Sequence, residues 1–366
     1  MTDRSFMAQA LALAALGEGT TRPNPLVGCV VVADGAVVGR GFHRAAGEPH
    51  AEALALAEAG ARARGATLYV NLEPCAHHGR TPPCAEAIVR AGIRRVVVAI
   101  GDPNPQVDGR GLAALRSAGI GLAEGVLESE ARALNAPFLS THQRGRPFVT
   151  LKAAQSLDGR IAAAGGNSTW VTGDASRRYA HRLRFRHDAV LVGAATVRRD
   201  DPRLTVRLPG VDAVRHRVVL APRLGLDTAA RVFVRESGSA PRTRVYVGST
   251  CAEAEVARFR DVAEIVPVAC GAFGLDLAAV LADLRQAGVQ AVLVEGGGKT
   301  SGAFLRAGLV DEIVLFIAGR LFGAGEATPV IDLPAVTDPA KAWTITPVRY
   351  IPLGPDLVVV GRPGAS

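Results

Sequence analysis

Short apolar runs that resemble strands alternate with helical segments along almost the whole sequence. The first part has helical patterns at about residues 6–16, at 51–63 and after Cys84, interleaved with strand patterns at 27–32, 37–42, 67–70 and 95–100. Asp34-Gly35 lies between the first two strand patterns and predicts a hairpin turn. Strands that alternate with helices indicate an α/β sandwich.

A second α/β pattern follows the polar stretch Ser140–Pro147, which contains Gly and Pro and is the predicted linker. It has a helix at about 176–185 and strands at 148–153, 189–192, 217–220, 245–247, 291–294 and 312–317. A chain of 366 residues is also too long for one ordinary core. We therefore predict two α/β domains, residues 1–146 and 147–366.

The basic charge of the chain does not by itself indicate nucleic-acid binding. The formal net charge is +8, but 39 of the 42 basic residues are Arg in an Ala- and Gly-rich chain, which is typical of a GC-rich genome. No dense Lys/Arg run with interleaved aromatics occurs, so we expect no nucleic-acid partner. Scattered Arg suits small phosphorylated substrates equally well.

No apolar run reaches the ~20 residues that span a bilayer. The apolar stretch 7–16 is short and follows Asp3 and Arg4, so it indicates a first amphipathic helix rather than a signal peptide. We expect a cytoplasmic protein without a membrane partner, and a homo-oligomer.

Five cysteines without regular spacing argue against a disulfide framework. We expect Cys29, Cys251 and Cys270 to be packing residues. Cys75 and Cys84 are different, because each follows a Pro and a His-Ala-Glu triplet precedes them at residues 50–52.

Three ligands, His50, Cys75 and Cys84, would leave a fourth zinc position open for water, as hydrolysis requires. Glu52 would then carry protons to a ring nitrogen and to the departing amine. The alternatives are a structural zinc closed by His77 or His78, or unrelated core thiols.

The eight residues between the cysteines, together with Thr21-Arg-Pro-Asn-Pro-Leu-Val-Gly and Gly101-Asp-Pro-Asn-Pro-Gln-Val-Asp-Gly, carry a family resemblance. The first domain resembles the deaminase domain of the bifunctional RibD family of riboflavin biosynthesis. The resemblance implies a cytidine-deaminase-like three-layer α/β/α fold. It also implies a substrate of 2,5-diamino-6-(5-phosphoribosylamino)pyrimidin-4(3H)-one, whose 2-amino group leaves as ammonia.

Further polar residues of these motifs are candidate substrate contacts. The Asn24 amide would hold the base or sugar, or else form an Asx-type turn. His43, His77 and Arg80 would bind the ribose phosphate, or else belong to a solvated loop.

The second domain lacks Gly-x-Gly-x-x-Gly after its first strand. Gly296-Gly-Gly-Lys-Thr is not a P-loop either, because the first glycine of that pattern would fall on Leu293. A strand ending in Glu295, a glycine turn and a helix from about Thr300 remain. Backbone amides at such a helix start suit a pyrophosphate.

Four motifs in order resemble the reductase domain of the same family: Lys152-Ala-Ala-Gln-Ser-Leu-Asp-Gly-Arg, Ser168-Thr-Trp-Val-Thr-Gly, Asp200-Asp-Pro-Arg-Leu-Thr-Val-Arg and Val294-Glu-Gly-Gly-Gly. This resemblance implies a dihydrofolate-reductase-like α/β domain that uses NADPH to reduce the ribosyl group of 5-amino-6-(5-phosphoribosylamino)uracil to ribityl. The implied NADPH contacts are Ala154, Trp170, Thr196, Asp200, Gly297, Gly298, Lys299, Thr300, Ser301, Gly302 and Ala303. The implied substrate contacts are Ser168, Arg184, Leu204, Arg207 and Glu295, and Lys152 is a further candidate.

Arg184 and Arg207 suit the substrate phosphate because a guanidinium binds it through two donors, although surface arginine is the alternative. Lys152, Asp200 and Glu295 are the candidates for proton handling. The family commonly shows Asp-Ser where this chain has Ala221-Pro222, so a hydroxyl that helps to bind the cofactor is missing and the preference for NADPH over NADH is weakened.

Two other classes of protein explain less of the sequence. A nucleic-acid-editing deaminase needs a basic, aromatic-lined channel, and aromatics make up only 5% of the chain. A non-catalytic zinc module accounts for neither Glu52 nor the ordered reductase motifs.

Overall fold

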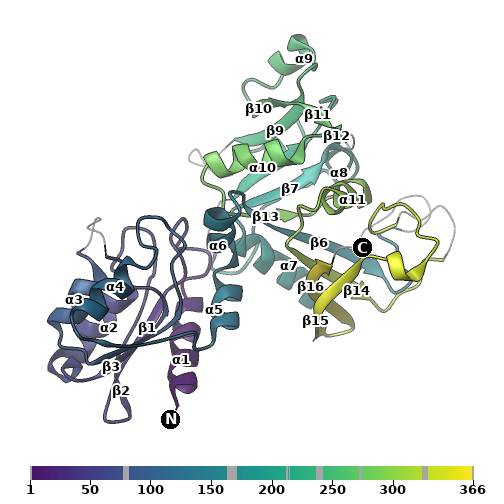
Figure 1. The fold of residues 1–366 in the computed structure, drawn as a ribbon. Coiled ribbons are helices and arrows are strands. Elements are labelled where there is room, and N and C mark those ends of the chain that lie inside the picture. Colours follow the sequence, from purple (N-terminus) through teal and green to yellow (C-terminus); the bar gives the residue numbers. More distant parts are fainter. Residues whose placement is uncertain are drawn as a thin grey trace. The chain divides into compact units, whose positions relative to one another are not determined.

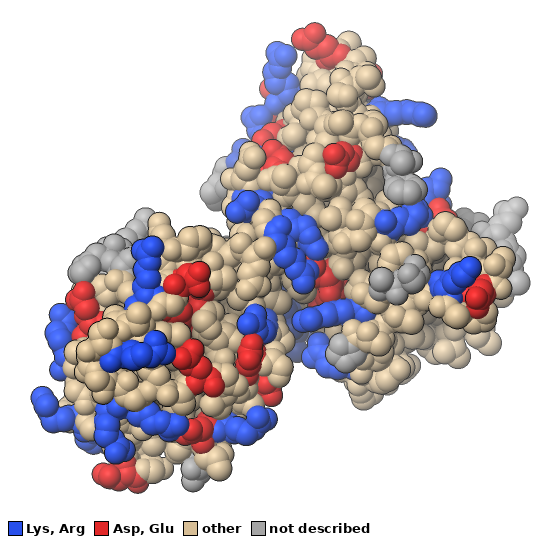
Figure 2. Space-filling view, viewed as in Figure 1, with Lys and Arg blue, Asp and Glu red and all other residues tan. Residues whose placement is uncertain are grey.

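The computed structural model describes residues 2–76, 82–162, 171–211, 213, 215–235, 242–271, 274–323 and 329–364. The chain divides into two compact units, residues 1–146 and 147–366 (Figure 1). In the parts described, every helix is too short or too polar to cross a membrane. On the visible face of each unit, acidic side chains lie among the basic ones (Figure 2).

Unit 1 is built on a five-stranded sheet with the order β2-β1-β3-β4-β5. β1 is antiparallel to β2 and to β3, whereas β3, β4 and β5 run parallel. The strands are β1 (Gly28–Ala33), β2 (Ala36–Phe42), β3 (Thr67–Leu72), β4 (Arg95–Ile100) and β5 (Gly121–Glu124). The helices are α1 (Asp3–Ala15), α2 (Ala51–Ala59), the 3-10 turn η1 (Gly60–Ala63), α3 (Cys84–Arg90), α4 (Arg110–Ser117), α5 (Glu128–Leu134) and α6 (Ala136–Gln143).

Both faces of this sheet are buried, as the β1 sequence Gly-Cys-Val-Val-Val-Ala indicates. Cys29 and Val31 pack with residues of α2, α3 and α4 on one side, while Val30 and Val32 pack with residues of α1, α5 and α6 on the other. Successive side chains of a strand point to opposite faces, so one apolar run serves two cores. The predicted three-layer α/β/α arrangement is confirmed.

The predicted hairpin is also confirmed. Asp34 and Gly35 have φ angles of 50° and 76°, and Ala33 pairs with Ala36 across them. Positive φ at both central residues is typical of a two-residue type I′ turn, whose twist matches that of the strands.

Glycines in β2 allow α2 to lie directly on the strand. A Cβ atom added to Gly41 would lie 2.2 Å from the Ala51 carbonyl oxygen, and one added to Gly39 would lie 2.1 Å from that of Ala55. Only glycine permits this approach. The start of α2, which carries His50 and Glu52, is therefore positioned by close backbone contact with β2.

Unit 2 is built on a nine-stranded sheet with the order β10-β9-β8-β7-β13-β6-β14-β16-β15. Its strands are parallel from β10 to β14. β16 is antiparallel to β14, and β15 is antiparallel to β16. The strands are β6 (Phe148–Ser156), β7 (Ala189–Gly193), β8 (His216–Leu220), β9 (Thr243–Gly248), β10 (Ala263–Val268), β13 (Ala291–Val294), β14 (Glu312–Ala318), β15 (Thr344–Leu353) and β16 (Asp356–Gly364), with a separate small hairpin β11 (Cys270–Gly271) and β12 (Gly274–Leu275). The helices are α7 (Asp174–Arg186), α8 (Ala194–Asp200), α9 (Glu253–Ala257), α10 (Leu277–Gln286) and α11 (Gly298–Arg306), and the 3-10 turns are η2 (Arg231–Phe233) and η3 (Pro339–Lys341).

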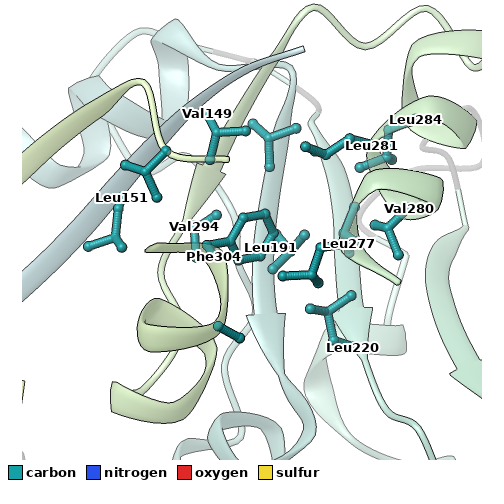
Figure 3. Close-up of a cluster of buried hydrophobic side chains, with 14 of the residues drawn as sticks. Val149, Leu151, Leu191, Leu220, Leu277, Val280, Leu281, Leu284, Val294 and Phe304 are labelled. Atoms are coloured by element: carbon teal, nitrogen blue, oxygen red, sulfur yellow. The ribbon is translucent and has the colours of Figure 1, made fainter. Parts of the chain in front are cut away.

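A large apolar cluster joins α10 and α11 to one face of the sheet (Figure 3). Leu281 and Phe304 come from these helices, and Val149, Leu191 and Val294 come from three adjacent strands; all five are completely buried. The cluster holds the helix after β13 against the sheet.

The central strand β13 lies between β6 and β7, although it begins 98 positions after the end of β7 and still further after β6. The strand order reverses at this point. In parallel sheets ligands bind outside the carboxyl ends of the strands where the order reverses. Residues after β6, β7 and β13 therefore face the expected binding region of unit 2.

Several predicted elements need correction. The predicted linker Ser140–Pro147 begins inside α6, because Ser140 is buried and its hydroxyl donates to the Arg146 carbonyl. The helix predicted to reach residue 63 changes to a 3-10 turn at Gly60. Cys29 is buried as expected, but Cys251 is only partly buried and Cys270 is exposed, so Cys270 is not a packing residue.

Candidate active sites

Three predicted zinc ligands converge in unit 1. The His50 Nδ1 atom lies 3.2 Å from the Cys84 Sγ atom and 3.6 Å from the Cys75 Sγ atom. The three ligand atoms all lie within 4.8 Å of one another. One imidazole nitrogen and two thiolate sulfurs at this spacing fit a tetrahedral zinc ion with one open position.

Local structure brings these ligands together from distant parts of the sequence. His50 is the residue before α2, Cys84 is the first residue of α3, and Cys75 lies in the turn after β3. The Cys84 backbone N–H donates to the Cys75 sulfur over 3.4 Å, and the Ala85 N–H donates to the Cys75 carbonyl over 3.1 Å. The start of α3 therefore holds the turn that carries Cys75, and helix N-termini favour the anionic form of the ligands.

Glu52 lies in the first turn of α2, two residues after His50, and is only 4% exposed. The pKa of its carboxyl is raised to about 7, mainly by burial; the nearby Cys75 sulfur also raises the pKa, and His50 lowers it. Hydrogen bonding to Cys84 and to His50 lowers the pKa of the Cys75 thiol to about 4, and the same thiol–thiol contact with burial raises the pKa of Cys84. Glu52 is thus a buried proton acceptor beside the three ligands.

Asn24 and His43 lie together next to His50. The Asn24 amide nitrogen is 3.0 Å from His43 Nε2, and His43 Nδ1 is 3.2 Å from the Pro49 carbonyl oxygen. The His43 and His50 rings meet edge to face at 5.6 Å. A carbonyl oxygen can only accept a hydrogen bond, so the Nδ1 atom of His43 must carry the ring hydrogen. The Nε2 atom then accepts a hydrogen bond from the Asn24 amide.

His43 is 3% exposed, and burial lowers the pKa of its imidazole. Both ring nitrogens of this neutral side chain are engaged within the protein, so this geometry presents neither of them to a phosphate. His77 and Arg80, the other predicted phosphate contacts, lie outside the described residues.

Sequence reasoning missed two asparagines that hold the loop of Asn24. Asn135 accepts from the Leu26 N–H over 2.8 Å and donates to the Leu26 carbonyl over 3.0 Å. Asn71 donates to the same carbonyl over 2.8 Å and accepts from the Gly28 N–H over 2.8 Å. Both asparagines are buried. Their partners are distant in sequence, so no local signal identifies them.

Glu73 is a third missed residue, and it lies two positions before Cys75. Its buried carboxylate accepts four backbone N–H groups, from Asp102, Gly109, Gly111 and Leu112. These bonds attach the Gly101–Gly109 motif and the start of α4 to the segment of Cys75. The position of Glu73 directly before Pro-Cys was the only signal in the sequence.

In unit 2, Glu295 forms the centre of a buried ionic group. Its carboxylate accepts from Arg184 Nε over 2.8 Å and from Arg184 Nη2 over 2.9 Å, and Lys152 Nζ lies 3.9 Å away. Burial alone would raise the pKa of Glu295, but the charges of Arg184 and Lys152 lower it to about 2. Glu295 is therefore ionised at neutral pH.

Arg184 is also bonded elsewhere, because its Nη1 donates to the Thr205 carbonyl over 2.9 Å. Its side edge, Nε and Nη2, is occupied by Glu295. In this geometry Arg184 orients Glu295 and residue 205, and its contact with the substrate phosphate stays a prediction.

The glycine turn lies between β13 and α11, where Gly297 is the N-cap residue with extended backbone. The Thr300 side chain packs closely against Gly193 and Gly296, and the Thr196 hydroxyl lies near Gly297. Ser301 and Ala303 are buried, and the segment around Asp332 covers Gly302. Gly297, Lys299 and Thr300 are therefore the residues at the start of α11 that keep some exposure.

The other predicted reductase residues lie around this region or outside the description. Lys152 and Ala154 are partly buried on β6, Asp200 ends α8, and Leu204 is buried with a φ angle of 56°. Ser168 and Trp170 lie outside the described residues.

Comparison with known proteins identifies the family. Residues 147–359 match the family model of the RibD C-terminal domain, and residues 1–100 match that of the cytidine and deoxycytidylate deaminase zinc-binding region. The riboflavin biosynthesis protein RibD of Aquifex aeolicus is 43% identical over 98% of this chain and 97% of its own. The chain belongs to the RibD family. The RibD of Escherichia coli is 42% identical, with 98% of each chain covered.

Solved structures agree. The structure of Acinetobacter baumannii RibD has a TM-score of 0.87 at 38% identity, with 99% of each chain covered. That of a Thermotoga maritima diaminohydroxyphosphoribosylaminopyrimidine deaminase/5-amino-6-(5-phosphoribosylamino)uracil reductase has 0.86 at 38% identity, again with 99% of each chain covered. The predicted fold classes are confirmed, and the chain is a bifunctional deaminase and reductase of riboflavin biosynthesis that uses zinc and NADPH.

Proposed function

We propose that the two units divide the two reactions. Residues 1–146 hydrolyse 2,5-diamino-6-(5-phosphoribosylamino)pyrimidin-4(3H)-one to the uracil derivative and ammonia. Residues 147–366 then reduce 5-amino-6-(5-phosphoribosylamino)uracil with NADPH, so that its ribosyl group becomes ribityl. The observation that carries the assignment is the convergence of His50, Cys75 and Cys84 beside buried Glu52 within one unit.

In the deaminase site each residue has a distinct task. Zinc held by His50, Cys75 and Cys84 supplies a water nucleophile at neutral pH. Glu52 takes the proton of the attacking water, passes it to the ring nitrogen and delivers a proton to the departing amine, so that water and the amine become a carbonyl and ammonia. Asn24 is placed to orient the base or sugar, because its amide nitrogen is held by neutral His43 and its loop is held by Asn71 and Asn135.

In the reductase site the protein must align the ribosyl carbon that is reduced with the nicotinamide carbon that gives up the hydride, and it must balance the charge of the bound groups. NADPH supplies the hydride. The backbone amides from Gly297 to Thr300 at the start of α11 suit its pyrophosphate. Glu295, oriented by Arg184, lies near Lys152, and this pair of opposite charges is the candidate for contacting the polar base.

We also propose a homo-oligomer in the cytoplasm. The long strand β15 is an edge of the nine-stranded sheet and exposes Val348 and Tyr350. An exposed apolar edge strand favours pairing with another chain. Light scattering of the purified protein tests the proposed self-association.

Metal analysis, combined with separate assays of ammonia release and NADPH oxidation, tests the assignment of one reaction to each unit. Wild type and Cys251→Ser should contain one zinc per chain, whereas Cys75→Ser should lose zinc and ammonia release. Cys75→Ser should still oxidise NADPH when it is given the deaminated ribotide. Unchanged zinc in Cys75→Ser, or loss of NADPH oxidation with the zinc, would contradict the proposal.

A further inference from the structure

The segment that follows β8 is where this chain departs from the family pattern. In place of the common Asp-Ser pair, Ala221 is buried, and Pro222 has neither a hydroxyl nor a backbone N–H. The next residue, Arg223, is exposed. A cationic side chain thus directly follows the position at which the hydroxyl is missing.

The backbone after Pro222 is held in an uncommon conformation. Leu224 and Gly225 have φ angles of 55° and 56°. A bulky residue such as leucine rarely adopts positive φ, so the surrounding structure must impose it. The Leu224 N–H donates to the Ala221 carbonyl over 2.8 Å, and the Leu224 side chain is buried in an apolar cluster of unit 2. The turn is therefore fixed, and backbone strain of this kind is often found at ligand-binding segments.

α8 connects this turn to the glycine turn before α11. In the first turn of α8, Thr196 lies near Gly297. In its last turn, Arg198 Nη1 donates to the Gly225 carbonyl over 3.3 Å. Because β7 and β8 are parallel neighbours, α8 and the turn after β8 leave the same edge of the sheet. A ligand with its pyrophosphate at the start of α11 can therefore extend along α8 to the turn after β8.

The positions of the neighbouring strands give the direction of such a ligand. β13 has β6 on one side and β7, followed by β8, on the other. β6 carries Lys152, which lies beside Glu295 in the ionic group proposed to contact the base. Hydride transfer requires the nicotinamide next to the substrate, so the adenosine belongs on the side of β7 and β8. In dinucleotide sites of parallel sheets, an arginine near the adenosine ribose accommodates the 2′-phosphate.

The charges of these segments favour an anion. Asp200 is the acidic residue of α8, and the turn 221–225 contains none. Arg199, the neighbour of Asp200, acts on it electrostatically. Arg198 and Arg223 are the further cations of the two segments, and both are exposed. Two guanidinium groups match a phosphate monoester, which carries a charge of about −1.5 to −2 at pH 7.

We propose that Arg198 and Arg223 bind the 2′-phosphate of NADPH and thereby make unit 2 select NADPH over NADH. The two guanidinium groups take over the function of the hydroxyl that Pro222 cannot provide. The inference rests on the proposed reductase function of unit 2 and deepens it by naming the residues that recognise this phosphate. It differs from the expectation, drawn from Ala221-Pro222 alone, that the preference for NADPH is weakened.

Calorimetry with two fragments of the cofactor tests the contact without catalysis. 2′,5′-ADP carries the 2′-phosphate, whereas 5′-AMP lacks it and is otherwise the same. The wild type should bind 2′,5′-ADP more tightly than 5′-AMP. Arg198→Gln and Arg223→Gln should each lower the affinity for 2′,5′-ADP by about tenfold to a hundredfold, the effect of one hydrogen bond to a charged group, and change that for 5′-AMP by less than about twofold.

Two further variants separate charge recognition from the structure of the turn. Arg223→Lys keeps the charge without the planar fork and should recover part of the affinity for 2′,5′-ADP. Arg258→Gln is the control, because Arg258 is an exposed arginine of unit 2 that pairs with Glu255, and it should bind both fragments like the wild type. Equal losses for both fragments in the Arg198 and Arg223 variants would show that these arginines only hold the turn, and would overturn the proposal. Equal affinity of the wild type for the two fragments would overturn it as well.

Kinetics with the deaminated ribotide separates this proposal from the function on which it rests. In Arg198→Gln and Arg223→Gln the KM for NADPH should rise while the KM for NADH stays unchanged. Failure of the wild type to oxidise either cofactor with the ribotide would contradict the proposed reductase function. The affinities for 2′,5′-ADP and 5′-AMP would still decide the role of the two arginines.

Discussion

Replacing Glu295 by Gln tests the electrostatics of the reductase site. A carboxyl group with a pKa of 4.5 in the unfolded chain and about 2 in the folded protein contributes about 3 kcal/mol to the free energy of unfolding at neutral pH. Because the folded-state pKa is the lower one, this contribution is complete above about pH 4.5 and is lost as the pH falls towards 2. Glu295→Gln removes it and also leaves Arg184, whose side chain is 15% exposed, without its counter-charge.

Urea unfolding followed by tryptophan fluorescence measures the free energy of unfolding of unit 2, because both tryptophans, Trp170 and Trp343, belong to residues 147–366. At pH 7 the wild type should be more stable than Glu295→Gln by about 3–5 kcal/mol. The difference should shrink as the pH falls from about 4.5 to 2.

Glu264→Gln is the matched control, since Glu264 also pairs with an arginine, Arg244, but is about half exposed. Surface pairs contribute about 0–1 kcal/mol, so this variant should differ little from the wild type. A stability difference for Glu295→Gln that is constant from pH 7 to pH 2 would refute the account of the Glu295 pKa.

Three further predictions concern unit 1. In Gly41→Ala the new methyl group would meet the Ala51 carbonyl and force α2 away from β2. The free energy of unfolding, measured by thermal unfolding, should fall by about 1–3 kcal/mol, and zinc binding, measured by competition with a chelator, should weaken. The control Gly271→Ala, whose methyl group meets open space, should change neither the stability nor the zinc affinity. Asn135→Ala leaves the partly buried Leu26 N–H without its acceptor, so steady-state kinetics should show a raised KM for deamination while zinc content and reduction of the deaminated ribotide stay normal. Removal of zinc by a chelator should stop ammonia release and leave NADPH oxidation with that ribotide unchanged, and a parallel loss of both would contradict the separation of the sites.

Some strands could be predicted from the sequence alone because their residues form a clear local pattern. The strands at 95–100 and 291–294 have the predicted bounds, because each is a short apolar run flanked by polar residues or glycine. The three candidate zinc ligands, which the fold brings together, could be selected for a similar reason, since each belongs to a short motif with its own chemistry.

Other elements depend on tertiary packing and were missed. β10 contains Pro267 and alternates weakly, and it forms a strand because β9 pairs with it. The polar residues 140–143 form part of α6 because Phe138 and Leu139 of that helix are buried in the core of unit 1.

The missed site residues act over long distances in the sequence. Asn135 bonds to Leu26 across 109 positions, and Asn71 bonds to the same residue across 45. No spacing rule connects such pairs. Only the folded arrangement of strands and helices brings them together.

The central claim is that two independent sites in one chain perform the two reactions. The most direct measurement uses full-length Glu52→Gln, which should retain its fold and zinc, and assays ammonia release and NADPH oxidation separately. Ammonia release from the diaminopyrimidine ribotide should fall by at least about 10²–10⁴-fold, while reduction of supplied deaminated ribotide should proceed at the wild-type rate. Loss of both activities in a folded, zinc-containing variant would mean that the two reactions share one site.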